Sequence, residues 1–404
     1  MERSMKKKLL ALAIAGAFAV PAASAMADSG NVTIYGQMRM SYDLVNPGYA
    51  NNTANGNVDS HNVNKVSDNS SRLGFKGTED LGNGLSAIWQ IESAIHADGD
   101  TSTLAGRNTF VGLSGKSWGT VLLGRHDTPY KMATRSLDVF NATIADNRSI
   151  LGEGYANFDG RQRNVLAYVT PNMNGFTGMI AYVAGGETAY QSSQDKGNAW
   201  SLAGVYKNGP WFGSLAYEKH NLGAFGTGTV ASPSATLPNL SNKDEHAWKL
   251  GLGYKWQAFK LGFVYEDTKD NFGGTTGANG YVNPKNSSDV FGHHAYSFNG
   301  AYAFSNNALK VAYTQSGDAG GWDNSGAKMW TVGIDHHFSK RTTIYALYTK
   351  LTNDTNNASE IGGRGASTGG IVSDASINPA TGALSGASLD SSPSAFSFGI
   401  NHKF

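Results

Sequence analysis

Apolar and polar residues alternate at every second position along many short stretches of this chain. In the segment 32–42, VTIYGQMRMSY, Val32 and Ile34 fall on one parity and Thr33 and Gln37 on the other. The same alternation recurs in the segments 84–93, 246–256, 295–304 and 394–404. Successive side chains of a β-strand point to opposite faces, so a period of two residues predicts strands with one apolar face.

Short turn signals and longer polar segments separate these stretches in a regular order. Hairpin signals recur at 82–84, 115–119, 171–175, 208–210, 256–258, 306–307 and 339–341. Longer polar segments lie near 45–64, 97–104, 128–161, 185–196, 221–243, 269–290, 317–326 and 352–392. Seven hairpins, with a first strand near 31–43 and a last strand near 393–404, give 16 strands. Tight turns at one end and long loops at the other are typical of outer-membrane barrels. We therefore predict an all-β fold, a 16-stranded antiparallel transmembrane β-barrel.

The N-terminal segment has the pattern of a secretory signal peptide. A basic stretch precedes an apolar run at 9–20, and small residues follow up to Ala27. The run is shorter than the roughly 20 residues that a membrane-spanning helix needs. We expect residues 1–27 to be removed and residues 28–404 to form one barrel domain.

Composition and charge narrow the function classes. The whole chain has 32 basic and 31 acidic residues, and removal of residues 1–27 leaves 28 basic and 30 acidic residues. A nearly neutral chain gives no reason to expect a nucleic-acid partner. The lack of cysteine excludes a disulfide scaffold. No phosphate loop, zinc signature or paired-carboxylate motif stands out, and we expect neither a cofactor nor an enzymatic activity.

The last residues, SAFSFGINHKF, are unusually apolar for a chain terminus. Phe396, Phe398, Ile400 and Phe404 fall on one parity. Lipid cannot satisfy an open sheet edge, so the first and last strands must pair. We expect the last strand to close the barrel, with its apolar side toward outer-membrane lipid and Phe404 in an aromatic girdle.

Four stretches, in order along the chain, resemble the Gram-negative general porins. VTIYGQMRM resembles their first strand, and SRLGFKGTEDLGNGLSAIWQIES resembles their second hairpin. GRNTFVGLSGKSWGTVLLGRHDTPY resembles the strands that lead into their pore loop, and SKRTTIYALYTK with the final HKF completes the match. The resemblance implies a homotrimer in the outer membrane of a Gram-negative bacterium, with the third long loop, here about 128–161, folded into the barrel. It also implies that the barrel-assembly machinery reads the C-terminal strand ending in Phe404.

Charged residues that face the lumen are the candidate functional residues. By alternation, Arg39, Arg72 and Glu92 lie opposite the apolar positions of their strands. A Lys or Arg that faces lipid at mid-depth costs ~2–4 kcal/mol, which favours the inward placement. Lys249 and Lys310 also fall on the inward parity, and we expect them to line wider parts of the lumen.

Two further arginines and the acidic residues of the third long loop complete the expected pore constriction. Both faces of the strands around Arg107 and Arg125 carry apolar residues, so alternation leaves their direction open and only the resemblance favours the lumen. The loop carries Asp138, Asp146 and Glu153, together with apolar residues that are expected to anchor it to the wall. A basic wall opposite an acidic loop would create a transverse field that tunes ion selectivity.

We interpret the chain as an outer-membrane general porin, a water-filled channel for passive diffusion of small hydrophilic solutes and ions. The alternative is a substrate-selective channel for sugars or organic anions. A sugar channel needs an aromatic path along the lumen, but most Tyr and Trp residues fall on the lipid-facing parity. A barrel enzyme such as a lipid hydrolase is a third possibility. The GKSWG sequence at 115–119 matches the hydrolase expression G-x-S-x-G, but it lies in a hairpin turn with no helix after it.

Overall fold

The computed structural model describes residues 32–48, 62–99, 104–152, 158–185, 197–221, 244–269, 292–320, 323–355, 357, 359–362, 376–377, 384–385 and 391–404. The expected signal segment 1–27 and Glu153 lie outside the described residues. So do most of the long polar segments near 221–243, 269–290 and 352–392.

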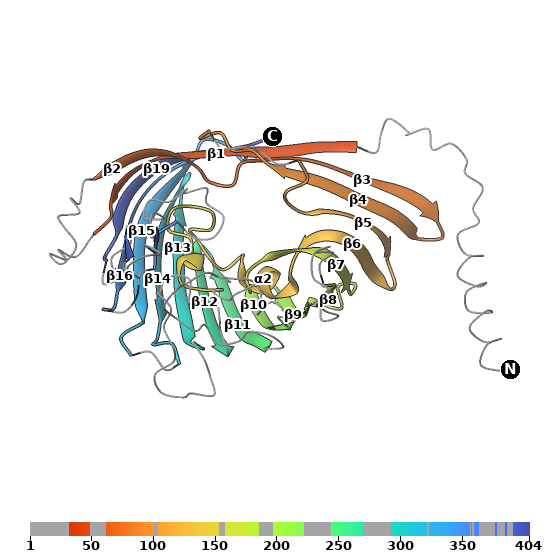
Figure 1. Ribbon diagram of the computed structural model, residues 1–404. Helices are drawn as coiled ribbons and strands as arrows, with labels where there is room; N and C mark the ends of the chain where they lie inside the picture. Colours follow the sequence, from red (N-terminus) through yellow and green to blue (C-terminus); the bar gives the residue numbers. More distant parts are fainter. Residues whose placement is uncertain are drawn as a thin grey trace.

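Seventeen of the described strands form one antiparallel sheet that closes on itself (Figure 1). The strands are β1 (Val32–Asn46), β2 (Val63–Asp68), β3 (Arg72–Gly82), β4 (Leu85–Ala94), β5 (Thr109–Gly115), β6 (Gly119–Asp127), β7 (Arg161–Val169), β8 (Phe176–Val183), β9 (Asn198–Asn208), β10 (Trp211–Asn221), β11 (Asp244–Trp256), β12 (Phe259–Lys269), β13 (His294–Phe304), β14 (Asn307–Ser316), β15 (Ala327–His337), β16 (Thr342–Asn353) and β19 (Ser394–Lys403). The last strand, β19, pairs with β16 on one side and with β1 on the other, and this closes the barrel. The short strands β17 (Ser376–Ile377) and β18 (Leu384–Ser385) pair only with each other.

Strands β2 and β3 are two halves of one wall strand. Both pair with β1, β2 along its second half and β3 along its first half. Ser70, between them, has a left-handed φ of 70°, and the chain bends there. With β2 and β3 counted together, the barrel has the 16 strands that the sequence predicts. Each of the seven predicted tight turns joins two consecutive strands, so these predictions are confirmed.

The two faces of the sheet differ as the alternation predicts. Large apolar side chains on the outer parity are exposed, while polar side chains such as Ser201 and Thr331 are buried on the inner parity. Aromatic rings pair across neighbouring strands near both ends of the outer face: Trp211 with Tyr254 at 4.4 Å and Tyr217 with Trp248 at 4.5 Å between ring centroids. Two such bands are the girdles of a barrel that crosses a membrane with its strands.

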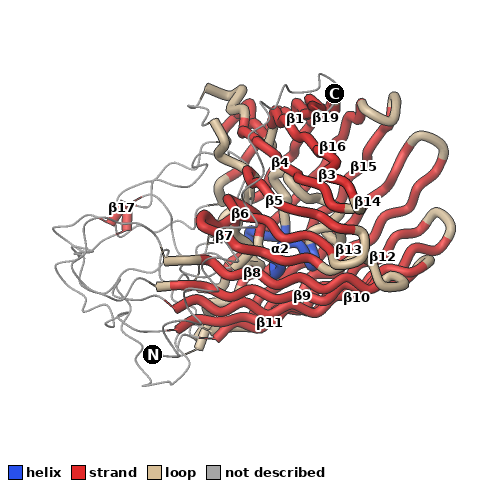
Figure 2. Tube along the Cα trace, turned by 90° about the vertical axis from the view of Figure 1, so that its right-hand side faces the viewer, coloured by secondary structure: helices blue, strands red, loops and turns tan. Residues whose placement is uncertain are grey.

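The segment between β6 and β7 leaves the wall and packs against its inner face. It contains α2 (Pro129–Thr134) and the short 3-10 helix η2 (Asn147–Ser149). Figures 1 and 2 both show α2 in the space that the strands enclose, and α2 contacts β8, β9, β10 and β11. Neither helix in the described residues is long and apolar enough to cross a membrane.

Candidate functional site: the inner wall and the crossing segment

Polar contacts fix both ends of the segment 128–160 to the wall. The Thr128 hydroxyl caps α2 by accepting a hydrogen bond from the Lys131 amide at 3.3 Å. The Tyr130 hydroxyl donates to Glu266 of β12 at 2.8 Å, and the Gly152 amide donates to the other oxygen of the same carboxylate at 2.7 Å. Glu266 therefore holds the start and the later part of the segment at one point.

A buried lysine holds the end of the segment. Lys249 of β11 lies 2.6 Å from Asp159 and 3.2 Å from Glu266, and its ammonium group lies 4.1 Å from the centroid of the Tyr130 ring. The ring of Phe158 stacks on His220 of β10 at 4.7 Å. The expectation that Lys249 lines open lumen is wrong, because the segment covers it and leaves it fully buried.

Apolar side chains in the middle of the segment pack against the inner wall of the barrel. Phe140, Ile144, Ile150 and Leu151 are fully buried in one cluster with wall residues of β1, β12, β13, β15, β16 and β19. Glycines lie in the wall where the segment touches it. A methyl group added at Gly251 or Gly333 would meet the side chain of Leu137 or Phe140, respectively. The small wall residues thus make room for the large residues of the segment.

Two further lysines of the inner wall also contact the segment. Lys260 of β12 donates to the Ser136 carbonyl at 2.8 Å. Lys310 of β14 pairs with Asp335 at 2.8 Å and lies 4.8 Å from the centroid of the Phe140 ring. Lys310 is therefore a support for the segment, which the sequence analysis did not anticipate.

The carboxylates Asp138 and Asp146 face cations of their own segment. Arg135 lies 2.7 Å from Asp146 and 3.6 Å from Asp138, and Arg148 lies 2.9 Å from Asp146. Burial opposes ionisation of Asp146, but the two arginines hold its pKa well below the usual range. Burial and the neighbouring Asp146 charge raise the pKa of Asp138 to about 6 despite Arg135. The structure thus pairs both carboxylates inside the segment and does not direct them at the wall arginines.

Glu92 of β4 forms ion pairs with two arginines of the inner wall. Arg107 donates to one oxygen of Glu92 at 2.5 Å, and Arg72 lies 3.6 Å from the other oxygen. The Tyr35 hydroxyl donates to Glu92 at 3.0 Å. Arg39 of β1 lies near enough to Arg72 for their charges to interact. Two guanidinium groups therefore share a single carboxylate, and the charge of Arg39 lies close to one of them.

Tyr35 is a member of this cluster that the sequence analysis missed. Its ring lies over Gly74 of β3, where any side chain would collide with it, and its hydroxyl reaches Glu92 on the next strand. Tyr35 shares the inward parity of Arg39 on β1. The parity rule could have found it, because Tyr35 is an exception to the lipid-facing parity of most Tyr and Trp residues.

The strand register places Arg125 on the outer face, so the expectation that it joins the constriction is corrected. Arg125 pairs with Thr109, one step of the ladder beyond the outward-facing pair Val111 and Leu123, which are 58% and 55% exposed. Because β5 and β6 carry apolar residues on both faces, alternation in the sequence did not give the direction of the Arg125 side chain.

A closed antiparallel barrel of 16 strands, with an apolar outer face and a charged inner wall, defines an outer-membrane channel of the porin class. A model of the Gram-negative porin family matches residues 11–356, and the chain belongs to this family. It is 29% identical over 384 residues to outer membrane porin protein 32 of Delftia acidovorans, covering 91% of this chain and 95% of that protein.

Solved structures show the same fold. The anion-selective porin from Comamonas acidovorans superposes with a TM-score of 0.69 at 23% identity, over 92% of this chain and 99% of that chain. The trimer form of the Vibrio cholerae outer membrane protein OmpT superposes with a TM-score of 0.62 at 17% identity, over 93% of this chain and 100% of that chain. The protein is therefore a porin of the Gram-negative outer membrane that lets small hydrophilic solutes diffuse passively.

Proposed function

We propose that the segment 128–161 narrows this diffusion channel, and that Arg39, Arg72 and Arg107 with Glu92 form the wall opposite it. The single observation that carries the proposal is the unequal charge of that wall, where Arg72 and Arg107 share one carboxylate and the charge of Arg39 adds to that of Arg72. The loop adds no opposing negative field, because Asp138 and Asp146 are paired with Arg135 and Arg148. Anions then pass the constriction more easily than cations.

The size of the effect follows from Coulomb's law. One charge at 4 Å changes the energy of a passing ion by ~1 kcal/mol in water, and by more where the protein walls lower the dielectric. An excess of two positive charges on the wall therefore biases ions by a few kcal/mol at most. This magnitude gives a preference and not tight binding. The solved porin from Comamonas acidovorans is itself described as anion-selective, which agrees in direction.

The measurement that tests the proposal is the reversal potential of the reconstituted channel across a KCl gradient. The expected sign is that of chloride preference, and the preference should shrink at high salt because the screening length falls from ~10 Å at 0.1 M to ~3 Å at 1 M. A potassium preference at low salt would overturn the proposed anion preference.

The alternative of a substrate-selective channel for sugars or organic anions predicts conductance that saturates with solute. A linear conductance favours the general pore.

We also propose that the protein acts as a homotrimer whose contact face includes β4, β5 and β6. Outside these strands, ring pairs mark the outer face from β8 to β16 and β19. The large exposed residues within β4–β6 are aliphatic instead: Ile91, Val111, Leu113 and Leu123. Aromatic girdles mark contact with lipid headgroups. An outward Arg125 would cost ~2–4 kcal/mol in lipid, and a protein contact on this face avoids that cost.

Three further roles complete the proposal. Residues 1–27 act as an export signal that is removed, and residues 28–404 form the barrel domain. The barrel-assembly machinery recognises the last strand through Phe404. The channel has no enzymatic activity, in keeping with the family to which the chain belongs.

A further inference from the structure

The seam where β1 meets β19 carries a cluster of polar side chains that the pore does not use. Asp43, Ser67, Asn69 and Ser397 are fully buried, and Ser41 is buried beside them. The register brings them together: Asp43 lies directly opposite Ser397, and Ser41 lies directly opposite Ser67. Opposite side chains in an antiparallel pair have Cβ atoms roughly 4.5–5.5 Å apart, so these groups are within contact distance.

A chain of hydrogen bonds orients the cluster. The Asn69 amide nitrogen donates to the Ser41 hydroxyl at 2.7 Å, and this hydroxyl donates to Asp43 Oδ2 at 3.1 Å. The Asn69 nitrogen also lies 3.4 Å from the Tyr345 hydroxyl. The Asn69 amide and the Ser41 hydroxyl are thereby directed at acceptors, whereas Asp43 Oδ1 and Asn69 Oδ1, which carry no proton, have no donor among the described residues.

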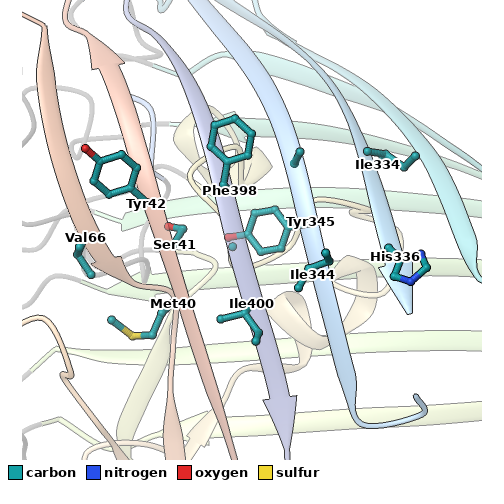
Figure 3. Close-up of a pocket in the computed structure, with 12 residues that line it drawn as sticks. Met40, Ser41, Tyr42, Val66, Ile334, His336, Ile344, Tyr345, Phe398 and Ile400 are labelled. Atoms are coloured by element: carbon teal, nitrogen blue, oxygen red, sulfur yellow. The ribbon is translucent and has the colours of Figure 1, made fainter. Parts of the chain in front are cut away.

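Tyr345 forms one side of the cluster. Its ring extends from β16 across β19 toward Ser41 of β1 (Figure 3), over Gly399, where any side chain would collide with the ring. The outer side of the same seam is an apolar groove lined by residues such as Met40 and Phe398. Lipid-facing apolar residues therefore separate the polar cluster from the membrane.

Four buried oxygens in this cluster have no hydrogen-bond partner among the described residues: Asp43 Oδ1, Asn69 Oδ1, Ser67 Oγ and Ser397 Oγ. A buried polar atom normally has a partner, and a buried carboxylate needs a cation or several donors. Among the described residues, Asp43 accepts a hydrogen bond from one donor, the Ser41 hydroxyl. The nearby Arg39 directs its guanidinium toward the Tyr345 ring, 5.9 Å from the centroid.

We propose that this cluster binds one monovalent alkali cation, which is trapped when the barrel closes. Hard cations take oxygen ligands, and the cluster offers a carboxylate with hydroxyl and amide oxygens. One carboxylate neutralises one positive charge. A divalent ion would leave an excess charge in a buried site next to Arg39, so the charge balance selects Na⁺ or K⁺ over Ca²⁺.

The site connects four wall strands with one another and, through Tyr345, with the crossing segment. Its residues come from β1, β2, β16 and β19 and from the connection between β2 and β3. Tyr345 belongs to the apolar cluster that also contains Ile144 of the crossing segment. A bound cation would thus stabilise both the closing seam and the wall on which that segment rests. The proposal is independent of the anion preference of the pore.

The first test is diffraction. The full mature porin is unfolded in urea, refolded in RbCl and crystallised, and anomalous scattering is collected at the rubidium edge. We expect a peak in contact with Asp43 Oδ1. Absence of a peak in well-ordered density at the seam would overturn the proposal and mean that water fills the site.

The second test is stability. The porin is refolded in NaCl, KCl, CaCl₂ or choline chloride at equal ionic strength, and the midpoint of heat modification on gels is measured. We expect higher midpoints in NaCl or KCl than in choline chloride, and no such difference in Asp43→Asn. Asp335→Asn is the matched control, since Asp335 already pairs with Lys310 at 2.8 Å, and should keep the difference.

Each remaining outcome decides the matter. Equal midpoints in all salts would mean that Lys65, opposite Asp43 on β2, balances the carboxylate, and would overturn the proposal. A larger stabilisation in CaCl₂ would overturn the monovalent assignment. If Asp43→Asn fails to refold, Ser67→Ala removes one ligand without changing the charge and should reduce the difference between salts.

Discussion

The main chain of Phe404 exchanges two hydrogen bonds with Gly36. The Gly36 amide donates to the Phe404 carbonyl at 3.0 Å, and the Phe404 amide donates to the Gly36 carbonyl at 3.1 Å. The Phe404 ring lies over Gly36, where a methyl group would collide with it. The last residue of the chain thus completes the ladder between the first and last strands at the end of the barrel that carries the tight turns.

Deletion of Phe404 removes this closing contact and the expected assembly signal together. We expect less heat-modifiable, membrane-inserted porin while export continues, measured by cell fractionation and unheated gels. Gly36→Val separates the closing contact from the assembly signal, because it leaves Phe404 in the chain and blocks only the position that its ring occupies over Gly36. If the truncated chain assembles at the normal level, neither role of Phe404 stands.

Substitution of Arg72 by Ser should shift the reversal potential toward cations. One of the two guanidinium groups that pair with Glu92 is lost, and a charge contributes ~1 kcal/mol to an ion at 4 Å in water. The shift should shrink as salt rises, and single-channel conductance should change only modestly. Arg125→Ser is the matched control, because the register places Arg125 on the outer face, and it should leave selectivity unchanged. The opposite result, a change with Arg125→Ser alone, would reverse the assignment of the two arginines.

The crossing segment should loosen when its anchor at Glu266 is weakened. Tyr130→Phe removes the hydrogen bond to this carboxylate, and a hydrogen bond to a charged group contributes ~1.5–3 kcal/mol. We expect more open-channel noise or a larger conductance in planar bilayers. Tyr265→Phe removes a hydroxyl from the neighbouring, outward-facing residue and serves as the control. Identical traces from both variants would show that the Tyr130 bond does not hold the segment.

Acidification should increase the anion preference through Asp138. The pKa of this carboxyl in the folded protein, about 6, is above its ordinary value, so the folded state favours the protonated form. The resulting contribution to stability is fully present below the unfolded pKa of ~3.9 and is lost as pH rises through 6. Between pH 7 and pH 5 the segment loses most of one negative charge.

The reversal potential at pH 7 and pH 5 measures this change. The wild-type channel should gain chloride preference on acidification, and Asp138→Asn, which is neutral throughout, should lack that increment. Other groups titrate in both proteins and cancel in the comparison. Equal pH responses in the two channels would remove Asp138 as the origin.

Polar substitutions on the aliphatic outer face should weaken the trimer. Val111→Gln and Leu123→Gln place amides in the proposed subunit contact, and a buried amide without a partner costs ~1–3 kcal/mol. We expect monomers on unheated gels and in light scattering. Leu215→Gln, on the ring-bearing outer face of β10, is the control and should remain trimeric. Dissociation of the Leu215 variant alone would place the contact on the opposite side of the barrel.

The turn signals determined the strand number and the turns, and the alternation determined the directions of Arg39, Arg72 and Glu92. The reason is that a membrane barrel imposes a period of two residues and an apolar outer face on every strand, and both are local properties of the sequence. The closing role of the last strand followed from the same requirement, since lipid leaves no edge unpaired.

Only the tertiary structure decided which charges meet. Asp138 and Asp146 are neutralised by Arg135 and Arg148 because the segment folds back on itself. Lys249 is buried because a distant residue, Asp159, comes to rest on it. Such contacts depend on where a long loop lies, and no local period encodes that position.

The seam between β1 and β19 shows the same division between what the sequence and what the tertiary structure determined. Parity alone puts Ser41 and Asp43 on the inner face of β1. Their partners Ser67, Asn69 and Ser397 come from the second and the last strands, and barrel closure sets the register that brings them together. Sequence patterning thus fixed which face each residue occupies, whereas pairing between the two ends of the chain fixed its neighbours, because those contacts form only when the barrel closes.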